Sequence, residues 1–318
     1  MLWLTDHPEI TMAFPPAKGA WSPCSTSELA PTERELWDLL AGRADCWRRG
    51  ATPSTRYPER LAILIDHAPS SQFEVLQRAL RAGTALPDGL VCLALTGTRF
   101  RGQRQRSWMA LRGNLHLAVH YRLDFPAASA EAPLIMLPAV AAAESIRRTS
   151  EGRCVPAIKW VNDLVLPAGK VAGVLTATQI ESGRIASALF GIGINLERAP
   201  AIDPTPFVPR AAALVDTDPN LRGKLPELFA ALVSALDEGI RSLEENGSDD
   251  VYRRYRAGSA CIGREARLWP ASCDDPDRVP PLAWGRIADI LPDLSLLLDG
   301  CAEPIRNARL ALLPPDVG

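Results

Sequence analysis

Two of the four lysines in this chain lie close together in one short stretch. The chain has 35 basic residues, and only Lys18, Lys159, Lys170 and Lys224 are lysines. Lys159 and Lys170 both fall in IKWVNDLVLPAGKVAGVL, residues 158–175. A lysine ammonium is a compact charge on a slim stem, so two of them can neutralise one anion from two sides where arginine would crowd. This spacing predicts a binding site for an anionic ligand.

Polar residues and glycines accompany these lysines where strands are expected to end. Asn162 and Asp163 come directly after a short predicted strand. An amide beside a carboxylate suits a Mg²⁺ ion or a ribose, and the same pair is also common in turns and caps. Gly173 lies inside a predicted strand, and Asn195 follows the glycine-rich GIGI. Both positions indicate close approach of a ligand or of another backbone.

A basic loop lies earlier in the chain, between two predicted strands. Residues 99–106 hold four arginines and one glycine, and Trp108 follows them. Guanidinium groups bind phosphate or carboxylate in a bidentate way, and Gly102 lets the backbone approach closely. The loop is therefore either a solvated surface loop in an arginine-rich chain or an anion cradle that orders on ligand binding. Its arginines are Arg99, Arg101, Arg104 and Arg106.

Two histidines, His116 and His120, lie four residues apart in a predicted strand. The alternation of a strand places them on one face with Ala118 and Arg122. We expect them to pack and to form hydrogen bonds beside the pocket. A metal pair is the alternative, but no third ligand is in view.

The elements that carry these residues predict an α+β fold with prominent hairpins. Short apolar or alternating runs predict strands, and 3.6-residue periodicity predicts helices. Strands are expected at 61–66, 90–95, 115–121 and 157–161, with a hairpin at 170–180 and 185–195. Helices are expected at 71–81 with Ser71 as the N-cap, at 132–148, at 221–245 with a break near Pro226, and at 250–257.

The two ends of the chain differ from this middle part. Residues 1–58 are rich in Pro, Ser and Thr and predict an irregular extension with one helix at 32–40. After Gly258, four short strands separated by turns predict a small β-barrel. We therefore expect an irregular N-terminal extension over 1–58, a central α+β domain over 59–257 and a C-terminal domain over 258–318.

Composition argues against several classes of protein. The net charge of −2 gives no sign of a nucleic-acid binder. The apolar runs at 133–143 and 287–298 are too short or too interrupted to span a bilayer, and the first residues lack the regions of a signal peptide. Seven scattered cysteines without a CxxC motif are typical of reduced thiols. We expect a cytoplasmic protein that binds neither nucleic acid nor membrane.

The motifs resemble those of the biotin–protein ligases, in the biotin/lipoate A/B protein ligase family. KWVNDL, GKVAGVL and GIGIN resemble the family's K-W-P-N-D-L, G-K-x-x-G-x-L and G-x-G-x-N. The basic loop resembles G-R-G-R-R-G-R-x-W, APSSQFEVL resembles the S-T-N segment with its helix, and GNLHLAVHYR resembles G-x-N-L-x-x-S-x-x-x-R. The resemblance runs from about residue 61 to residue 313. It implies a mixed sheet flanked by helices, followed by an SH3-like barrel.

This resemblance implies a two-step acyl transfer. ATP with Mg²⁺ activates biotin as biotinyl-5′-AMP, and a lysine of a biotin carboxyl carrier protein then takes up the biotinyl group. Such a site must gather and neutralise one carboxylate and several phosphates. Residues 1–58 are expected to pack against the core or against a second subunit, so a homodimer is left open.

Carried over position by position, the resemblance implies three groups of site residues. The catalytic group is Lys170, at the biotin carboxylate and the α-phosphate, with Arg101 and Arg104. The biotin-binding group is Ser70, Ser71, Gln72, Gly102, Gln103, Trp108 and Gly173. The group for ATP and Mg²⁺ is Lys159, Asn162, Asp163, Arg106 and Asn195, with Asp163 as the metal ligand.

The biotin end departs from the family pattern more than the phosphate end does. The family's biotin-contacting glutamine is replaced by Gly97 or Thr98. The other positions that differ from the family pattern are Gln72, Phe100, Gln103, Gln105, Ala118, Val161 and Thr176. We therefore predict a biotin–protein ligase with two alternatives. One is a ligase or acyltransferase for another acid, such as lipoate or octanoate; the other is a non-catalytic relative that binds a ligand or a carrier. A DNA-binding ligase is disfavoured because residues 1–58 offer only one helix.

Overall fold

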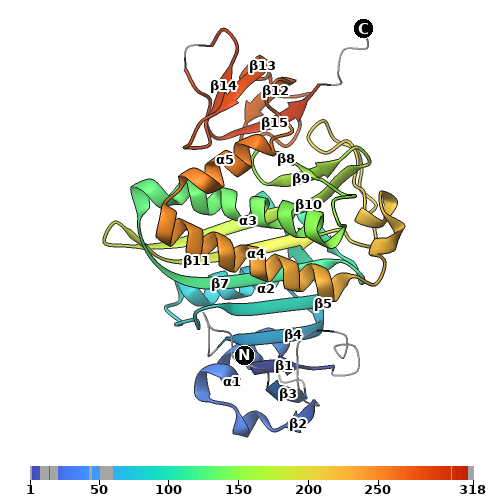
Figure 1. The fold of residues 1–318 in the computed structure, drawn as a ribbon, viewed down its shortest axis with the longest axis vertical. Coiled ribbons are helices and arrows are strands. Elements are labelled where there is room, and N and C mark those ends of the chain that lie inside the picture. Colours follow the sequence, from blue (N-terminus) through green and yellow to red (C-terminus); the bar gives the residue numbers. More distant parts are fainter. Residues whose placement is uncertain are drawn as a thin grey trace.

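The largest element of the structure is one mixed sheet that carries helices on both faces (Figure 1). The computed structural model describes residues 2–7, 14, 21–42, 45–50, 60–301 and 303–313. The sheet has 11 strands in the order β2-β3-β1-β4-β5-β7-β11-β10-β9-β8, with β6 paired to β5. Strand β4 runs parallel to both β1 and β5, and the other pairs are antiparallel. The expected α+β class is confirmed.

Most strands and helices from residue 61 onward were predicted, but the short strands at 107–110 and 163–166 were missed, and several elements are longer than expected. The strands of the main sheet are β1 (Leu2–Thr5), β2 (Ser22–Cys24), β3 (Cys46–Gly50), β4 (Leu61–Ala68), β5 (Leu90–Arg101), β6 (Ser107–Ala110), β7 (Leu115–Pro126), β8 (Ala157–Lys159), β9 (Asp163–Leu166), β10 (Gly169–Glu181) and β11 (Arg184–Ile194). The helices are α1 (Pro31–Ala41), α2 (Gln72–Arg81), α3 (Ala127–Thr149), α4 (Leu225–Asn246) and α5 (Asp249–Ala257). The predicted break near Pro226 is wrong: this proline lies in the first turn of α4, where its missing N–H costs no hydrogen bond.

Alternation along each strand divides the side chains between the two faces of the sheet. In β4, Leu61, Ile63 and Ile65 pack with α1 and α2. Ala62 and Leu64 point the other way, into the core beneath α3 and α4. A strand buried on both faces reads as a continuous apolar run, which is why LAILI is apolar throughout.

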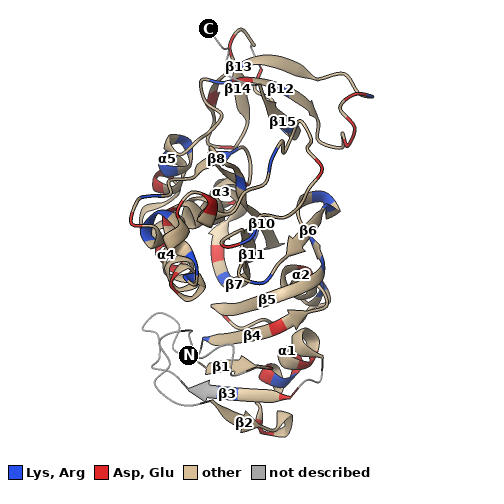
Figure 2. Ribbon diagram, turned by 90° about the vertical axis from the view of Figure 1, so that its right-hand side faces the viewer, with Lys and Arg blue, Asp and Glu red and all other residues tan. Residues whose placement is uncertain are grey.

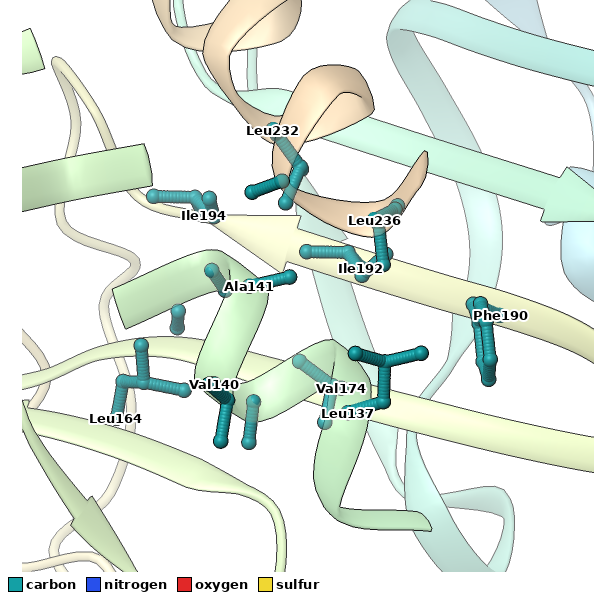
Figure 3. Close-up of a cluster of buried hydrophobic side chains, with 14 of the residues drawn as sticks. Leu137, Val140, Ala141, Leu164, Val174, Phe190, Ile192, Ile194, Leu232 and Leu236 are labelled. Atoms are coloured by element: carbon teal, nitrogen blue, oxygen red, sulfur yellow. The ribbon is translucent and has the colours of Figure 1, made fainter. Parts of the chain in front are cut away.

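The core beneath α3 and α4 is built from aliphatic side chains that interdigitate between helix and sheet. Figure 3 shows residues of both helices over β9, β10 and β11: Leu137, Val140, Ala141, Leu232, Leu236, Leu164, Val174, Phe190, Ile192 and Ile194. Among the described helices, α3 alone has the length and composition of a membrane span, and 67% of that stretch is buried inside the fold. The apolar run is thus longer than expected, and it forms the core of the fold.

The N-terminal extension is not irregular where the structure describes it. Strands β1, β3 and β2 continue the main sheet beyond β4, and α1 covers the same face as α2. The expected helix is confirmed, but the three strands were missed because each is only three to five residues long and its pairing with distant strands leaves no local periodicity. Residues 8–13, 15–20, 43–44 and 51–59, which include the predicted boundary, lie outside the described residues.

A smaller antiparallel sheet follows α5. Its strands are β12 (Glu265–Pro270), β13 (Ala283–Ile290), β14 (Leu296–Leu298) and β15 (Ala308–Leu312), in the order β14-β13-β12-β15. The four expected strands are confirmed, and their closure into an SH3-like barrel stays a prediction. Figure 2 shows this sheet at one end of the molecule and the N-terminal strands at the other.

Candidate functional site

A cavity of about 350 Å³, here called the main cavity, lies among β6, β7, β9, β10 and β11. A second hollow of about 450 Å³, the side cavity, reaches from there to β15. The predicted site residues that line the main cavity are Ser71, Gln72, Arg101, Gly102, Gln103, Arg106, Trp108, Asn162, Asp163, Lys170, Gly173 and Asn195. Arg104 and Lys159 line the side cavity alone, and Ser70 lines neither. The fold therefore gathers segments that are far apart in the sequence.

Lys170 is fixed at the centre of the main cavity. Its Nζ lies 2.5 Å from Oδ1 of Asp163, and both side chains are mostly buried. The same ammonium lies 5.8 Å from the centre of the Trp108 ring, within the range of a cation–π interaction. A Cβ on Gly173 would stand 3.5 Å from both Lys170 and Trp108, so the glycine leaves room between them. Asp163 and Trp108 thus aim one positive charge into the cavity.

Lys159 is held by the backbone of a loop. It ends β8 directly opposite Asp163 on β9, and it is 9% exposed. Its Nζ donates a hydrogen bond to the carbonyl oxygen of Phe207. Burial lowers the pKa of Lys159, and the nearby Asp163 carboxylate partly opposes that shift. We expected Lys159 near phosphates, and in this structure its ammonium faces the side cavity and the Phe207 carbonyl.

The two asparagines differ in how much of each amide the protein uses. Asn162 is tied to β10, because its Nδ2 donates to the Val174 carbonyl at 2.8 Å. Asn195 is 2% exposed, and its Nδ2 donates to the Ala212 carbonyl at 3.2 Å. Its Oδ1 is buried without a partner. A buried acceptor without a donor is costly, so this oxygen is suited to a ligand hydroxyl or to a cation.

The basic loop closes one side of the main cavity. Gly102 N–H donates to the Arg106 carbonyl at 2.7 Å, which pinches the loop into a short turn. Arg99, Arg104 and Gln105 have φ of 52°, 59° and 62°, in the left-handed region that residues other than glycine rarely adopt. Burial lowers the pKa of Arg104, and the positive charge of Arg106 lowers it further. The guanidinium groups of Arg104 and Arg106 therefore repel each other, and a bound anion would offset that repulsion.

Arg309, on β15 of the small sheet, adds a charge that sequence reasoning did not single out. It lines both cavities. Its guanidinium lies 3.6 Å from the centre of the Phe207 ring and is 3.3 Å from Asp274, an exposed carboxylate. Burial and the charge of Arg106 lower the pKa of Arg309 to about 10. The small sheet therefore contributes a cation to the same site.

The loop after β11 was also missed by sequence reasoning. It lines the main cavity with Pro200, Ile202 and Thr205, and Phe207 from the same loop packs edge-on against Trp269 of the small sheet. Neither this loop nor Arg309 carries a local motif, since each reaches the site only through long-range packing. An isolated phenylalanine in a proline-rich loop was the one available signal.

One wall of the main cavity is largely apolar, with one unused amide. Phe73, Phe100 and Leu117 line it together with Ser71 and Gln72. Gln72 is 2% exposed, and its Nε2 has no hydrogen-bond partner. Ser71 precedes α2 as expected, but its side chain makes no capping hydrogen bond. This end suits a largely apolar ligand body that carries a hydrogen-bond acceptor.

Trp108 is joined to a buried histidine behind the cavity. Its Nε1 donates to Nδ1 of His116 at 3.4 Å, and His116 Nε2 lies 3.2 Å from the Leu111 carbonyl. Burial lowers the pKa of His116 to about 4. His120 instead lies beside the Pro87 carbonyl, with Nδ1 at 2.9 Å. The expected role in packing and hydrogen bonding is the one that both histidines have here.

Comparison with known proteins shows which sequences this chain resembles. Residues 72–195 match the model of the biotin/lipoate A/B protein ligase family. The biotin–[acetyl-CoA-carboxylase] ligase of Mycobacterium tuberculosis is 28% identical over 246 residues, which cover 74% of this chain and 80% of that protein. The bifunctional ligase/repressor BirA of Bacillus subtilis is 32% identical over 120 residues. This match covers 37% of this chain and only 36% of the length of that relative.

The fold agrees with a solved structure. Biotin protein ligase from Aquifex aeolicus, in complex with biotin and ATP, superposes with a TM-score of 0.58 at 17% identity, covering 80% of this chain and 99% of that one. At this identity the likeness concerns the fold, and the matched sequence segment contains β6, β7, β9, β10 and β11, which line the main cavity. The central part of this chain, residues 72–195, is therefore similar to the biotin/lipoate A/B protein ligase family.

Proposed function

We propose that this chain is an ATP-dependent biotin–protein ligase. It forms biotinyl-5′-AMP from biotin and ATP and transfers the biotinyl group to a lysine of a biotin carboxyl carrier protein. The observation that carries the proposal is the lining of the main cavity, which brings Lys170, arginines of the basic loop and apolar side chains together. A molecule with an apolar body, a carboxylate and phosphates matches that order of surfaces.

In the first step, a carboxylate oxygen of biotin attacks the α-phosphorus of ATP, and the bond to the β-phosphate breaks to release pyrophosphate. Lys170 is placed to stabilise the negative charge on the carboxylate and on the α-phosphate oxygens. Arg101 and Arg106 from the basic loop and Arg309 from the small sheet hold the departing phosphates. Each of these groups acts by binding and orienting charge.

In the second step, the neutral amine of the acceptor lysine attacks the acyl carbon. The bond to AMP breaks, AMP departs with the electron pair, and the new amide loses a proton. Met109 and Ile202 line the main cavity and are each 40% exposed, so an acceptor can approach the cavity along an apolar edge. The apolar wall keeps water from the mixed anhydride until the acceptor arrives.

The residues present also fit a Mg²⁺ ion. Mg²⁺ is commonly held by one or two protein oxygens together with substrate phosphates. Asp163 offers a carboxylate, and Asn195 Oδ1 is a buried oxygen without a hydrogen-bond donor. Both line the main cavity. When bound, Mg²⁺ would screen the charge of the phosphates, and these two side chains would orient it.

One observation favours a second candidate, a ligase for another carboxylic acid. Phe100 packs over Gly97 so closely that a Cβ there would lie 2.2 Å from the phenyl ring. This ring occupies a position where the related family has glycine, so it reshapes the wall that contacts the acid. An acid with a slimmer body than biotin, such as lipoate or octanoate, is the alternative substrate.

Pyrophosphate release tests the proposal and separates the two candidates. The purified chain is given ATP and Mg²⁺ with biotin, lipoate or octanoate, each at the same concentration. We expect release with biotin and little with the other two acids. Release with lipoate or octanoate alone would favour the second candidate. No release with any acid, from a chain that is folded and binds ATP, would contradict both.

A further inference from the structure

We infer that His116 is a positioning residue that holds Trp108 in place as the wall against which the acid substrate is bound. The part of this inference that concerns the acid rests on the proposed function. The part that concerns Trp108 rests on the geometry of β6 and β7 alone. No contact between His116 and the reacting atoms is implied.

The two hydrogen bonds of His116 determine its tautomer. The indole N–H of Trp108 is a donor only, so Nδ1 of His116, 3.4 Å away, must carry no proton. Nε2 then carries the proton and donates to the Leu111 carbonyl at 3.2 Å. Because both ring nitrogens are used and the ring is 2% exposed, the imidazole works as a neutral clip.

This clip ties a weakly supported strand to the main sheet. Strand β6 follows the basic loop and pairs only with β5 among the described strands. His116 lies in β7, and it bonds to Trp108 within β6 and to Leu111 just after it. Phe100 of β5 packs edge-on against the same imidazole, with ring centres 5.8 Å apart. His116 therefore fixes the end of β6 from which the basic loop departs.

The position of Trp108 leaves little freedom once this bond is made. Gly193, directly opposite His116 across β7 and β11, has no room for a Cβ, which would lie 2.3 Å from Trp108 Cζ2. On its other side the indole faces Lys170, at 5.8 Å from the ring centre. The indole is held at its N–H edge by His116 while its ring borders Gly193 and Lys170. Loss of the acceptor would leave a buried N–H unpaired and free the ring to turn.

Two substitutions separate the bonds that His116 makes. In His116→Asn the amide oxygen lies near the position of Nδ1 and still accepts from Trp108. In His116→Gln the amide nitrogen lies near the position of Nε2 and still donates to Leu111, but the acceptor for Trp108 is lost. His120→Gln is a matched control, because His120 lies on the same face of β7, is 1% exposed, and does not line either cavity.

The direct test is the indole N–H signal of Trp108 in a ¹H–¹⁵N spectrum of the ligand-free chain, assigned with Trp108→Phe. We expect His116→Gln to move this signal upfield and to speed its exchange with D₂O about tenfold, since a lost buried hydrogen bond corresponds to about 1.4 kcal/mol. His116→Asn and His120→Gln should leave the signal and its exchange close to those of the wild type. An unchanged Trp108 signal in His116→Gln would overturn the inference, whatever the substrate is.

Binding supplies the second readout. For the acid that supports pyrophosphate release, KM should rise about tenfold in His116→Gln, with kcat and the KM for ATP nearly unchanged. His116→Asn should restore most of the lost affinity. If all three variants lost acid binding, ATP binding and thermal stability together, His116 would be merely structural and the inference would be wrong. If no acid is turned over, the proposed function fails, while the indole signal still decides the role of His116.

Discussion

Lys159 and Lys170 lie on strands of the main sheet, whereas Arg101 ends β5 and Arg104 and Arg106 lie on the loop that follows it. Each lysine already has a partner within the protein: Lys170 meets Asp163 and Lys159 meets the Phe207 carbonyl. By contrast, Arg104 lies near Arg106, whose positive charge is among the causes that lower the pKa of Arg104. The two sets of cations are therefore prepared in opposite ways for an anion.

This difference has a physical meaning. A charge that is already oriented by a buried carboxylate needs no reorganisation when the reaction begins, and such preorganisation is the most effective way to stabilise a transition state. Guanidinium groups that repel one another gain most when a polyanion arrives, so they contribute to binding and to closure of the loop. We therefore expect lysine substitutions to act on the rate of the chemical step and arginine substitutions to act on affinity.

The largest effect should come from Lys170→Ala. Removing a charge that is aimed at the reacting carboxylate and phosphate should lower the rate of pyrophosphate release by about 10²-fold or more. Single-turnover release at saturating ATP measures this, with circular dichroism to confirm folding. Lys224→Ala is the matched control, because that lysine lies just before α4, is half exposed and pairs with Glu227. Wild-type rates in Lys170→Ala would show that this lysine is not catalytic.

Arg309→Gln should have the next largest effect, and it should act on affinity. Loss of a charge-assisted contact to a phosphate is worth about 2 kcal/mol, or roughly a 30-fold rise in the Kd for ATP. Isothermal titration with a non-hydrolysable ATP analogue measures this change. Arg267, an exposed arginine on the neighbouring strand β12, gives the control Arg267→Gln. If both variants bind the analogue equally, the small sheet does not serve the phosphate end.

The buried imidazole of His116 predicts that the stability of the fold depends on pH. The folded state lowers the pKa of His116 from 6.5 to about 4, so below pH 6.5 the unfolded chain binds a proton that the folded chain refuses. The stability that comes from keeping His116 neutral is fully present above pH 6.5 and is lost as the pH falls toward 4. Between pH 6.5 and pH 5 the free energy of unfolding should fall by about 1.5 kcal/mol. In urea titrations, His116→Asn should show that much less dependence on pH; an identical slope in both chains would contradict a buried neutral His116.

Gln103→Arg should give the smallest effect and test the loop directly. Gln103 lines both cavities, and a neutral amide gives an anion no charge-assisted bond. An arginine there should slow the escape of the adenylate about fivefold, or roughly 1 kcal/mol. Labelling of bystander lysines by released adenylate measures the escape, with Gln105→Arg as the neighbouring control. Equal labelling by all three chains would mean that the existing arginines already close the loop.

Local signals in the sequence were sufficient for the central fold. Most strands and helices from residue 61 onward follow from periodicity, because each buried face is recorded within a few residues of the same segment; the short strands β6 and β9 do not. The N-terminal strands were missed because they are short and depend on pairing with β4 and with each other. Thus the part of the sheet that depends on distant partners was not predictable from local patterns.

The same distinction applies to the site. Lys170, Asp163 and Asn195 were predicted because they occur in contiguous motifs, and they do line one cavity. Arg309 and Phe207 come from segments without a motif and reach the site by packing across the two sheets. Ser70 was predicted, with Ser71 and Gln72, from the resemblance to the S-T-N segment, but it lies outside both cavities, since the chain turns into α2 at that point. The partner of each charged group was invisible in the sequence.

The central claim is that Lys170 drives the formation of a biotinyl adenylate in the main cavity. The most direct measurement is a single-turnover reaction of the wild type and of Lys170→Ala with biotin, ATP and Mg²⁺, quenched and analysed by mass spectrometry for biotinyl-5′-AMP. We predict nearly one adenylate per wild-type chain and a rate lower by about 10²-fold in the variant. Absence of the adenylate from a wild-type chain that binds both biotin and ATP would contradict this account.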